Sequence, residues 1–141
     1  MSRVRVRLSD ADDLGWYEAE DRTIPPEAAR RKTEAQEVFI AELDGRRAGH
    51  LRLDFLWSKF PFIALIRVLP EFQRQGVGQG LLEFIENRLR DKGHDTLYSS
   101  SQVNAREAQA WHRHLGFEEC GILDGVNPGG IGEVFFRKRL R

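Results

Sequence analysis

Cysteine is nearly absent from this sequence, which has only Cys120 among its 141 residues. A single thiol cannot form an internal disulfide, and it cannot build a thiolate metal cage without other ligands. We therefore expect a reducing, cytoplasmic setting and no bound metal. Cys120 falls in a predicted strand, where a small core residue is favoured over a nucleophile.

Long apolar runs and an excess of either charge are also missing. The segment before residue 8 lacks the apolar run of a signal peptide, and no later stretch is long enough to span a bilayer. The 22 basic and 22 acidic residues balance, which gives no reason to expect nucleic acid or a membrane as partner. Nucleic-acid binding through the basic tail at 137–141 is the weaker alternative. We expect a soluble protein.

Nothing in the sequence divides the chain, since it has no internal repeat, low-complexity tract or linker. Its length and its apolar fraction of 40% fit one globular domain with a single core. We expect a single domain over residues 1–141, and the sequence is compatible with a homodimer.

The first third of the chain contains sequence patterns that predict two helices and three strands. Apolar residues and arginines alternate over 3–8, which predicts a strand with a solvated arginine face, although arginines can also bind phosphate. Ser9 or Asp10 can cap the helix that follows, and Pro25-Pro26 opens a second helical stretch to about Gln36. Two strands at 38–43 and 48–55 then flank a predicted hairpin turn at Asp44-Gly45.

The remaining segments complete a mixed α/β order. The run at 63–68 is almost wholly apolar, as in a central strand buried on both faces. An amphipathic helix begins at Val77 and stops at Lys92-Gly93. Further patterns predict a short strand at 96–98, a helix at 105–115, strands near 117–123 and 133–138, and a flexible connection over 125–132.

Gly76 and Gly78 fall where the apolar strand ends and the amphipathic helix begins. Unpaired backbone amides and the positive end of a helix dipole meet at such a point, so an anion can bind there. Glycines let a phosphate approach the backbone closely, although they can also serve only to shape a tight turn. The loop matches neither the Walker A motif nor the G-x-G-x-x-G fingerprint of dinucleotide folds.

These motifs resemble the GNAT superfamily of N-acyltransferases, whose acyl-CoA loop reads Q/R-x-x-G-x-G/A. Residues 73–78 match each fixed position, residues 66–70 resemble the central strand and its exit, and residues 104–117 resemble a later asparagine and helix. The resemblance implies a mixed, mostly antiparallel sheet of about six to seven strands with helices on both faces. This sheet would splay open to admit acyl-CoA.

The resemblance also implies which residues bind the coenzyme A co-substrate. The backbone of 66–68 would pair with the pantetheine arm, and the amide of Val68 would polarise the thioester carbonyl. The amides of 74–79 would hold the pyrophosphate. The full implied set is Ile66, Arg67, Val68, Arg74, Gln75, Gly76, Val77, Gly78, Gln79, Asn104 and Trp111. Asn104 is also predicted to cap a helix, with Glu107 at the third helical position.

The catalytic acid and base of the family have no equivalent here. Trp111 stands where many members carry a tyrosine acid, and Ser99 stands where a subset carries a glutamate base. An indole is a poor acid, and we favour packing for Trp111. The catalytic residues are therefore unassigned, with Ser99 and Trp111 as weak candidates. A thiolate leaves more readily than an amine, so this departure does not exclude activity.

The histidines do not form a metal site by their spacing. His112 and His114 are two residues apart on a predicted helix and point to different faces, unlike the i, i+4 pair of zinc enzymes. Either could act as a general base, but we favour surface or partly packed positions for both, and for His50 and His94.

An aromatic loop offers the main clue to the acceptor. Trp57, Phe60 and Phe62 could wall a pocket for an amine with an apolar portion, or pack in the core. A second set of residues could attract a cationic amine, or only complement a helix dipole: Asp10, Asp12, Asp13, Glu18, Glu20 and Asp21. We predict acetyl or short acyl transfer from coenzyme A to a primary amine of a small molecule or peptide. The alternative is an acyl-CoA-binding regulatory module without efficient catalysis.

Overall fold

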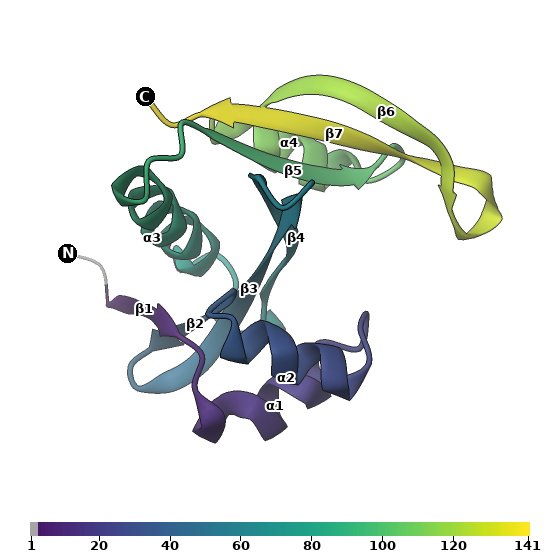
Figure 1. Ribbon diagram of the computed structural model, residues 1–141. Coiled ribbons are helices and arrows are strands. Elements are labelled where there is room, and N and C mark those ends of the chain that lie inside the picture. The colour runs from purple at the N-terminus through teal and green to yellow at the C-terminus, as the bar shows by residue number, and fades with distance from the viewer. Residues whose placement is uncertain (1–2) are drawn as a thin grey trace. The chain divides into compact units, whose positions relative to one another are not determined.

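The computed structural model describes residues 3–141, which form seven strands and four α-helices (Figure 1). The elements follow in this order: β1 (Val4–Leu8), η1 (Ala11–Asp13), α1 (Leu14–Glu20), α2 (Pro26–Glu34), β2 (Val38–Leu43), β3 (Arg46–Leu56), β4 (Phe60–Val68), η2 (Pro70–Phe72), α3 (Val77–Asp91), β5 (Thr96–Gln102), α4 (Arg106–His114), β6 (Glu118–Asn127), η3 (Pro128–Gly130) and β7 (Ile131–Arg139). The three η elements are short 3-10 helices.

The strands form a mixed sheet in the order β1-β2-β3-β4-β5-β7-β6. The β4/β5 pair is parallel, whereas β1/β2, β2/β3, β5/β7 and β6/β7 are antiparallel. The mostly antiparallel sheet and the central place of β4 are thus as predicted. The burial predicted for β4 is wrong, because Ile63 is buried but Arg67 is exposed and the residues between them are only partly covered.

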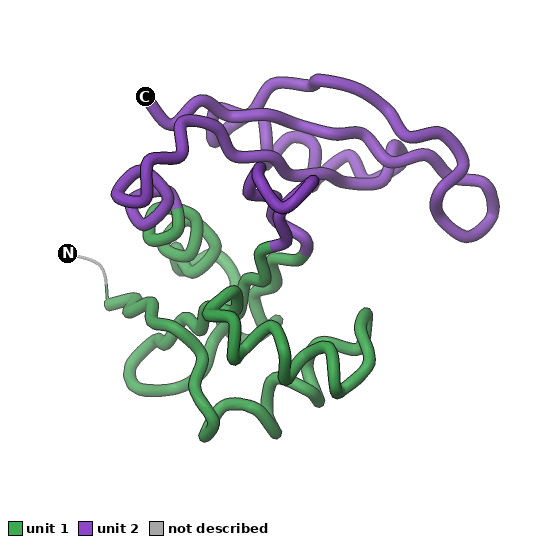
Figure 2. Tube along the Cα trace, viewed as in Figure 1, with its two compact units in different colours: residues 1–53, 65–85 green, residues 54–64, 86–141 purple. Residues whose placement is uncertain are grey.

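The contacts within the chain divide it into two compact units (Figure 2). The first unit holds the residues up to Leu53 together with 65–85, and the second holds 54–64 together with 86–141. Each unit therefore combines two separate stretches of sequence.

In the first unit, β1, β2 and β3 form an antiparallel meander with α1 and α2. The β2/β3 hairpin turns at Asp44 and Gly45, whose φ angles are +53° and +78°. Two consecutive left-handed residues match the twist of a hairpin, as Asp-Gly predicts. Tyr17 of α1, Ala29 of α2 and Ile40 of β2 are fully buried together.

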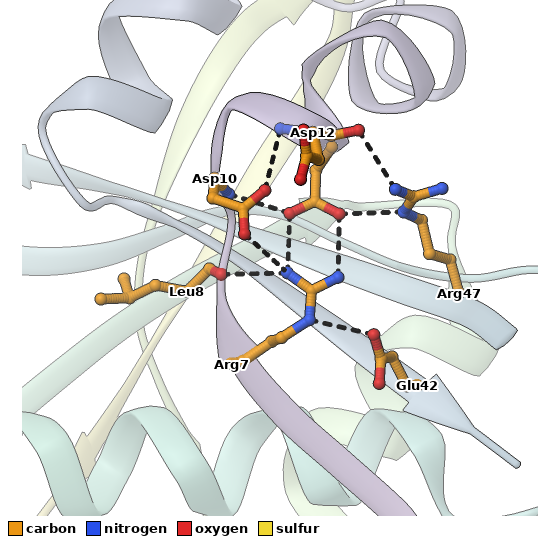
Figure 3. Close-up of polar contacts among 7 residues, drawn as sticks. Arg7, Leu8, Asp10, Asp12, Glu42 and Arg47 are labelled. Carbon is orange, nitrogen blue, oxygen red and sulfur yellow. Dashed lines mark hydrogen bonds and ion pairs between the residues drawn. The ribbon is translucent and has the colours of Figure 1, made fainter. Parts of the chain in front are cut away.

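An ion-pair network ties β1 to the residues that follow it (Figure 3). Arg7 donates two hydrogen bonds to the Asp13 carboxylate, at 2.7 and 2.8 Å, and a third to Glu42 at 3.0 Å. Arg47 donates to the same Asp13 carboxylate at 2.9 Å. Asp10 caps η1 as predicted. Arg7 is only partly exposed on the face predicted to be solvated, because its guanidinium pairs with carboxylates on neighbouring elements.

Asp13 is the buried centre of this network, with only 1% of its side chain exposed. Burial alone would raise its pKa, but hydrogen bonds from Arg7, the Asp10 amide and Arg47 outweigh burial and hold the pKa well below the usual carboxyl range.

A second buried carboxylate, Asp21, is also satisfied by the chain. It accepts hydrogen bonds from the Tyr17 hydroxyl at 2.5 Å and from the Arg52 guanidinium at 3.1 Å. Glu20 forms a looser ion pair with Arg67 at 3.8 Å. Arginines thus already pair with four of the acids that could have attracted a cationic acceptor: Asp10, Asp13, Glu20 and Asp21.

His50 of β3 contradicts the expected surface position, since none of it is exposed. Its ring lies edge-on to Trp16 and Tyr17, with centroids 5.8 and 5.3 Å away. Among the described residues 3–141, neither ring nitrogen has a hydrogen-bond partner. Burial lowers the pKa of His50 to about 4, so the ring is neutral at pH 7.

In the second unit, the pairing register separates two faces of the β5-β7-β6 sheet. Ser99 pairs with Phe136, and both side chains face α4. Ser100 pairs with Phe135, so both lie on the opposite face because side chains alternate along a strand. Glu133 shares that opposite face, which we call the open face.

The C-terminal strands are longer than their patterns predict. Strand β6 runs to Asn127 and β7 starts at Ile131, so the segment expected to be a flexible connection is mostly strand. Gly129 and Gly130, at φ +78° and +76°, make the tight turn that permits this. The prediction of Cys120 as a core residue is wrong, because β6 is an edge strand and Cys120 is exposed there.

Within residues 3–141, no helix is both long and apolar enough to cross a membrane.

The Asp13 network predicts a pH-dependent loss of stability. Asp13→Asn should lower the free energy of unfolding by about 2 kcal/mol at pH 7, because hydrogen bonds to a charged group are lost. Since the folded pKa is depressed, the ionised form stabilises the protein above the usual carboxyl pKa of about 4, and this stabilisation is lost as the pH falls below it. Urea unfolding at pH 7 and pH 3 should show the wild-type advantage shrinking at low pH.

The exposed neighbour Asp12 supplies the matched control, and Asp12→Asn should leave stability nearly unchanged. An Asp13→Asn deficit of equal size at both pH values would contradict the assignment of Asp13 as an ionised, paired group.

Candidate functional site

The predicted anion loop leaves β4, passes through η2 and enters α3 at Val77, all within the first unit. Residues 73–76 are exposed, and both Arg74 and Gly76 have left-handed φ angles, at +64° and +82°. For Gly76, which has no Cβ atom, this conformation has little steric cost. For Arg74 the conformation is strained, at roughly 1–2 kcal/mol. This conformation allows the chain to turn sharply into the helix.

The start of α3 presents free backbone donors. The first helical hydrogen bond runs from the Gly80 amide to the Gly76 carbonyl at 2.9 Å. Helix geometry leaves the earlier amides, those of Val77, Gly78 and Gln79, without a carbonyl of their own helix. A Cβ atom at Gly76 would meet nothing within 4 Å, so the space over this residue is open. Amides, helix dipole and open space together suit a phosphate group.

Gly49 of β3 lets the segments on either side of the loop pack closely against this strand. A Cβ atom there would lie 2.6 Å from the Arg67 carbonyl oxygen and 3.1 Å from a methyl carbon of Val77. Val77 itself is buried, with 1% exposed. The end of β4 and the first turn of α3 can therefore both approach β3 only because residue 49 has no side chain.

The other cofactor residues predicted in the first unit lie on β4 and in the loop. Ile66 and Val68 are half-buried. The side chain of Gln79 donates to Glu83 at 3.2 Å, and that of Gln75 makes a long contact of 3.5 Å with the Glu71 carbonyl. Backbone amides, more than these side chains, are thus the donors left available.

Two predicted cofactor residues, Asn104 and Trp111, lie in the second unit. Asn104 is exposed in a turn and does not cap α4, so the predicted cap is wrong. The N-cap residue is Ala105, without a side-chain hydrogen bond. Gln109 instead closes the turn, because its side-chain amide donates to the carbonyls of Gln102 and Val103 at 3.0 and 2.9 Å.

Ser99 and His112 form a buried hydrogen bond that the sequence did not predict. The Ser99 hydroxyl lies 2.7 Å from Nε2 of His112, and Nδ1 of His112 lies 2.7 Å from the Ala108 carbonyl. A carbonyl only accepts, so Nδ1 carries the proton and Nε2 accepts from Ser99. His112 also stacks on Phe136, with centroids 4.5 Å apart. Only 2% of Ser99 and 3% of His112 is exposed.

This environment keeps His112 neutral and corrects its expected surface position. Burial lowers the pKa of His112, although the Ala108 carbonyl and the charge of Glu133 oppose the shift. Trp111 is half-buried and lies edge-on to the His112 ring, at 5.4 Å between centroids. His114 is exposed. Across residues 3–141 there is no group of three or more metal-ligating side chains.

The three residues predicted to wall an acceptor pocket fall into two aromatic groups in the second unit. Phe60 packs edge-on to Trp57 at 6.1 Å and to Tyr98 at 6.0 Å. Phe62 stacks on Phe135 at 5.6 Å. Of the three predicted residues, only Trp57 lines an apolar groove of about 450 Å³, whose walls are Leu56, Trp57, Tyr98, Cys120, Gly121, Ile122, Leu123 and Phe135. Trp57 is 85% exposed at its rim.

The close approach of the chain to Gly49 predicts that even an alanine side chain there would destabilise the protein. Gly49→Ala should lower the free energy of unfolding by about 1–3 kcal/mol, because its methyl group meets backbone that cannot yield without a shift. Gly121→Ala is the matched control, since a Cβ atom on that strand glycine meets nothing within 4 Å. Urea unfolding of both variants tests this, and equal stability would refute the close approach.

The Ser99 to His112 hydrogen bond predicts a pH-dependent effect. The folded pKa of His112 is lowered, so the unfolded chain binds more protons below the usual histidine pKa of about 6.5. The stability that neutral His112 contributes is therefore present above pH 6.5 and lost as the pH falls. His112→Phe should be less stable than wild type at pH 8, and this deficit should shrink at pH 5.

Substitution of the exposed neighbour, His114→Phe, is the matched control for the change of ring and should leave the stability at pH 8 nearly unchanged. A His112→Phe deficit that stays constant between pH 8 and pH 5 would mean that His112 does not titrate as its burial requires.

The chain is similar in sequence to curated N-acetyltransferases. An aminoglycoside N(6')-acetyltransferase from Stenotrophomonas maltophilia is 37% identical over 91 residues, which are 58% of this chain and 60% of that protein. The ribosomal protein bS18-alanine N-acetyltransferase of Escherichia coli is 39% identical over 63 residues, 45% of this chain and 43% of its own length. The chain thus spans about half the length of these curated relatives.

A solved structure supports the fold over the whole chain. The Salmonella typhimurium protein yncA, solved with its cofactor acetyl-CoA, superposes with a TM-score of 0.80 at 17% identity, covering 99% of this chain and 95% of that one. The profile of the acetyltransferase (GNAT) family matches residues 6–117, which include the loop, the Gly49 approach and the Ser99 to His112 pair. Because this match covers most of the sequence, the chain belongs to the acetyltransferase (GNAT) family.

Proposed function

We propose that this protein transfers an acetyl or other short acyl group from coenzyme A to a primary amine. The observation that carries the proposal is the loop before α3. Its left-handed residues Arg74 and Gly76 expose amides at a helix N-terminus, with open space above them. A pyrophosphate needs donors of this kind, and the family membership supplies the identity of the ligand.

The chain's own residues would bind and orient the reactants. Amides from Arg74 to Gln79 hold the pyrophosphate, and the backbone of Ile66 to Val68 pairs with the pantetheine arm. When bound, the co-substrate supplies an activated acyl group as a thioester. Asn104 and Trp111 remain proposed contacts for the pantetheine arm and acyl-CoA tail. We also propose that residues 1–141 act as one domain, because the family match runs through both units.

The acceptor is a primary amine of a small molecule or a peptide. The relatives span both classes by name, with an aminoglycoside enzyme and a ribosomal protein alanine enzyme. A third relative, from Bacillus subtilis, is named an S-alkylcysteine N-acetyltransferase. The apolar groove of the second unit favours an acceptor with an apolar portion.

The loop assignment predicts the effect of reversing its charge and filling its open space. Arg74→Glu combined with Gly76→Asp should weaken acetyl-CoA binding on the order of 100-fold, because two charged groups then repel the pyrophosphate. Calorimetric titration with acetyl-CoA measures this effect. Arg30→Glu combined with Gly15→Asp makes the same charge change elsewhere in the first unit, and should bind like wild type.

Unchanged affinity in the loop variant would refute the coenzyme A site. Thiol release from acetyl-CoA over a panel of amines then tests transfer itself. The buried Ser99 hydroxyl and the indole at position 111 favour the second candidate, a regulatory module that binds acyl-CoA without efficient catalysis. Tight binding with no release on any amine would support that module, and release above the blank would exclude it.

A further inference from the structure

Glu133 of β7 carries a carboxylate that no cation neutralises within the described part of the chain, residues 3–141. Its two oxygens accept one hydrogen bond each, from the Ser100 hydroxyl at 2.6 Å and from the Asn127 side-chain amide at 3.0 Å. Both donors are neutral. Within residues 3–141, Glu133 is in no ion pair with a lysine, arginine or histidine. Its side chain is only half-buried, so its negative charge remains accessible.

The hydrogen bonds hold this carboxylate in a fixed place. Ser100 lies on β5 and Asn127 at the end of β6, so both neighbouring strands donate a hydrogen bond to one carboxylate of β7. A side chain held from two sides loses little further freedom when a ligand binds, which favours binding. An ionised carboxylate can accept about four hydrogen bonds, and only two are used here.

Glu133 does not itself line the apolar groove, but it neighbours two of the lining residues on the open face. Leu123, which lines the groove, is directly opposite Glu133 in the β6/β7 pairing. Phe135, also in the lining, is two residues along β7 and therefore points to the same side. Ser100, the partner of Glu133, pairs with that same Phe135. The carboxylate and the apolar walls thus share one surface.

Two of the acids that could have attracted a cationic amine already pair with arginines. Asp13 is satisfied by Arg7 and Arg47, and Asp21 by Arg52. An accessible carboxylate beside aromatic walls binds a cation that carries an apolar group, because the charge pairs with the carboxylate and the apolar group leaves water. The groove, at about 450 Å³, has the size of a small-molecule site.

We propose that Glu133 binds the ammonium group of a small aryl-alkyl or alkyl amine whose apolar portion occupies this groove. The inference rests on the proposed function in one respect, since it names the acceptor class of the same enzyme. It adds a specificity-determining residue, Glu133, and a chemical class, a cationic amine with an adjoining apolar group. It also makes Ser100 and Asn127 positioning residues that hold the carboxylate.

The test compares two ligands of equal shape in the absence of acetyl-CoA. The probes are 2-phenylethylamine, which is cationic at pH 7, and 2-phenylethanol, which is neutral. Titrations of isotope-labelled protein, followed by amide chemical shifts, give both affinities. The wild type should bind the amine roughly tenfold or more tightly, the range expected for a charge-assisted hydrogen bond. The shifts should include the amides of Ser100, Leu123 and Phe135.

Glu133→Gln keeps the shape of the side chain and removes its charge. This variant should bind the two probes equally, with an unchanged affinity for the alcohol. Glu118→Gln, an exposed glutamate on β6, is the matched control and should keep the preference for the amine. Phe135→Leu should lower the affinity for both probes by a similar factor, because it changes the apolar wall and not the charge.

Equal affinity of the wild type for both probes would overturn the proposal, and so would a preference that survives in Glu133→Gln. If the variant fails to fold, the wild type still tests the proposal, because equal affinities, or amide shifts that leave out Ser100, Leu123 and Phe135, would overturn it. The outcomes also separate this inference from the proposed transfer. A preference for the ammonium without thiol release from acetyl-CoA would contradict only the transfer, and thiol release without that preference would contradict only the role of Glu133.

Discussion

The candidate loop depends on one close approach, that of β4 and α3 to the bare backbone of Gly49. With a carbonyl 2.6 Å and a methyl group 3.1 Å from the place of a Cβ atom, no other residue fits there without displacing the chain. The exit of β4 is also held by a hydrogen bond from the Leu69 amide to the Ala48 carbonyl at 2.9 Å. Since Val77 must reach this packed position, the residues before it have to reverse direction quickly.

The strained backbone of the loop follows from that requirement. A sharp turn between a held strand and a held helix needs left-handed residues, and Arg74 and Gly76 provide them. Gly76 does so without a side-chain cost, whereas Arg74 does so at a cost that the surrounding packing offsets. The amides that could bind an anion are exposed by the same reversal. Binding geometry and core packing are therefore two results of one constraint.

Local features of the site could be predicted from the sequence, and long-range ones could not. The loop, the turn at Asp44 and Gly45 and the cap at Asp10 each depend on a few consecutive residues, whose types restrict the backbone directly. The pairs Ser99 with His112 and Ser100 with Glu133 depend on strand register. A slip of one residue would exchange the two faces of β5, and nothing in the short pattern at 96–98 indicates its register.

The same limit explains the wrong assignments at Asn104, Cys120 and His50. Asn104 has the right type for a cap, but the chain forms another turn first, and Gln109 closes it. Cys120 lies in a strand, but an edge strand leaves it exposed. His50 is polar, yet it lies on β3 in the stretch from Ala48 to Leu53, where every residue is buried. Residue type gives only a preference, and the neighbours decide burial.

Although the net charge is zero, the charged residues differ in whether a residue of opposite charge neutralises them. In the first unit, arginines and carboxylates neutralise each other at short range, and Arg7 and Asp13 stabilise the fold by doing so. In the second unit, Glu133 accepts hydrogen bonds from two neutral donors and, within residues 3–141, pairs with no arginine or lysine. Composition cannot distinguish these cases, because the difference lies in the partner and not in the acid. Steering by net charge is absent, so recognition of a cation must be local.

The hydrogen bond between Ser99 and His112 also bears on how transfer could proceed. His112 stays neutral because it is buried, and its acceptor nitrogen is occupied by the Ser99 hydroxyl. Neither group is then free to remove a proton from an amine or to protonate a sulfur. A thiol with a pKa of about 8.5 leaves far more readily as an anion than an amine does. Holding both reactants in contact would supply much of the rate. The proposed reaction would accordingly draw on the amide loop and the acceptor groove, and an ionisable residue at position 99 or 111 would not be required.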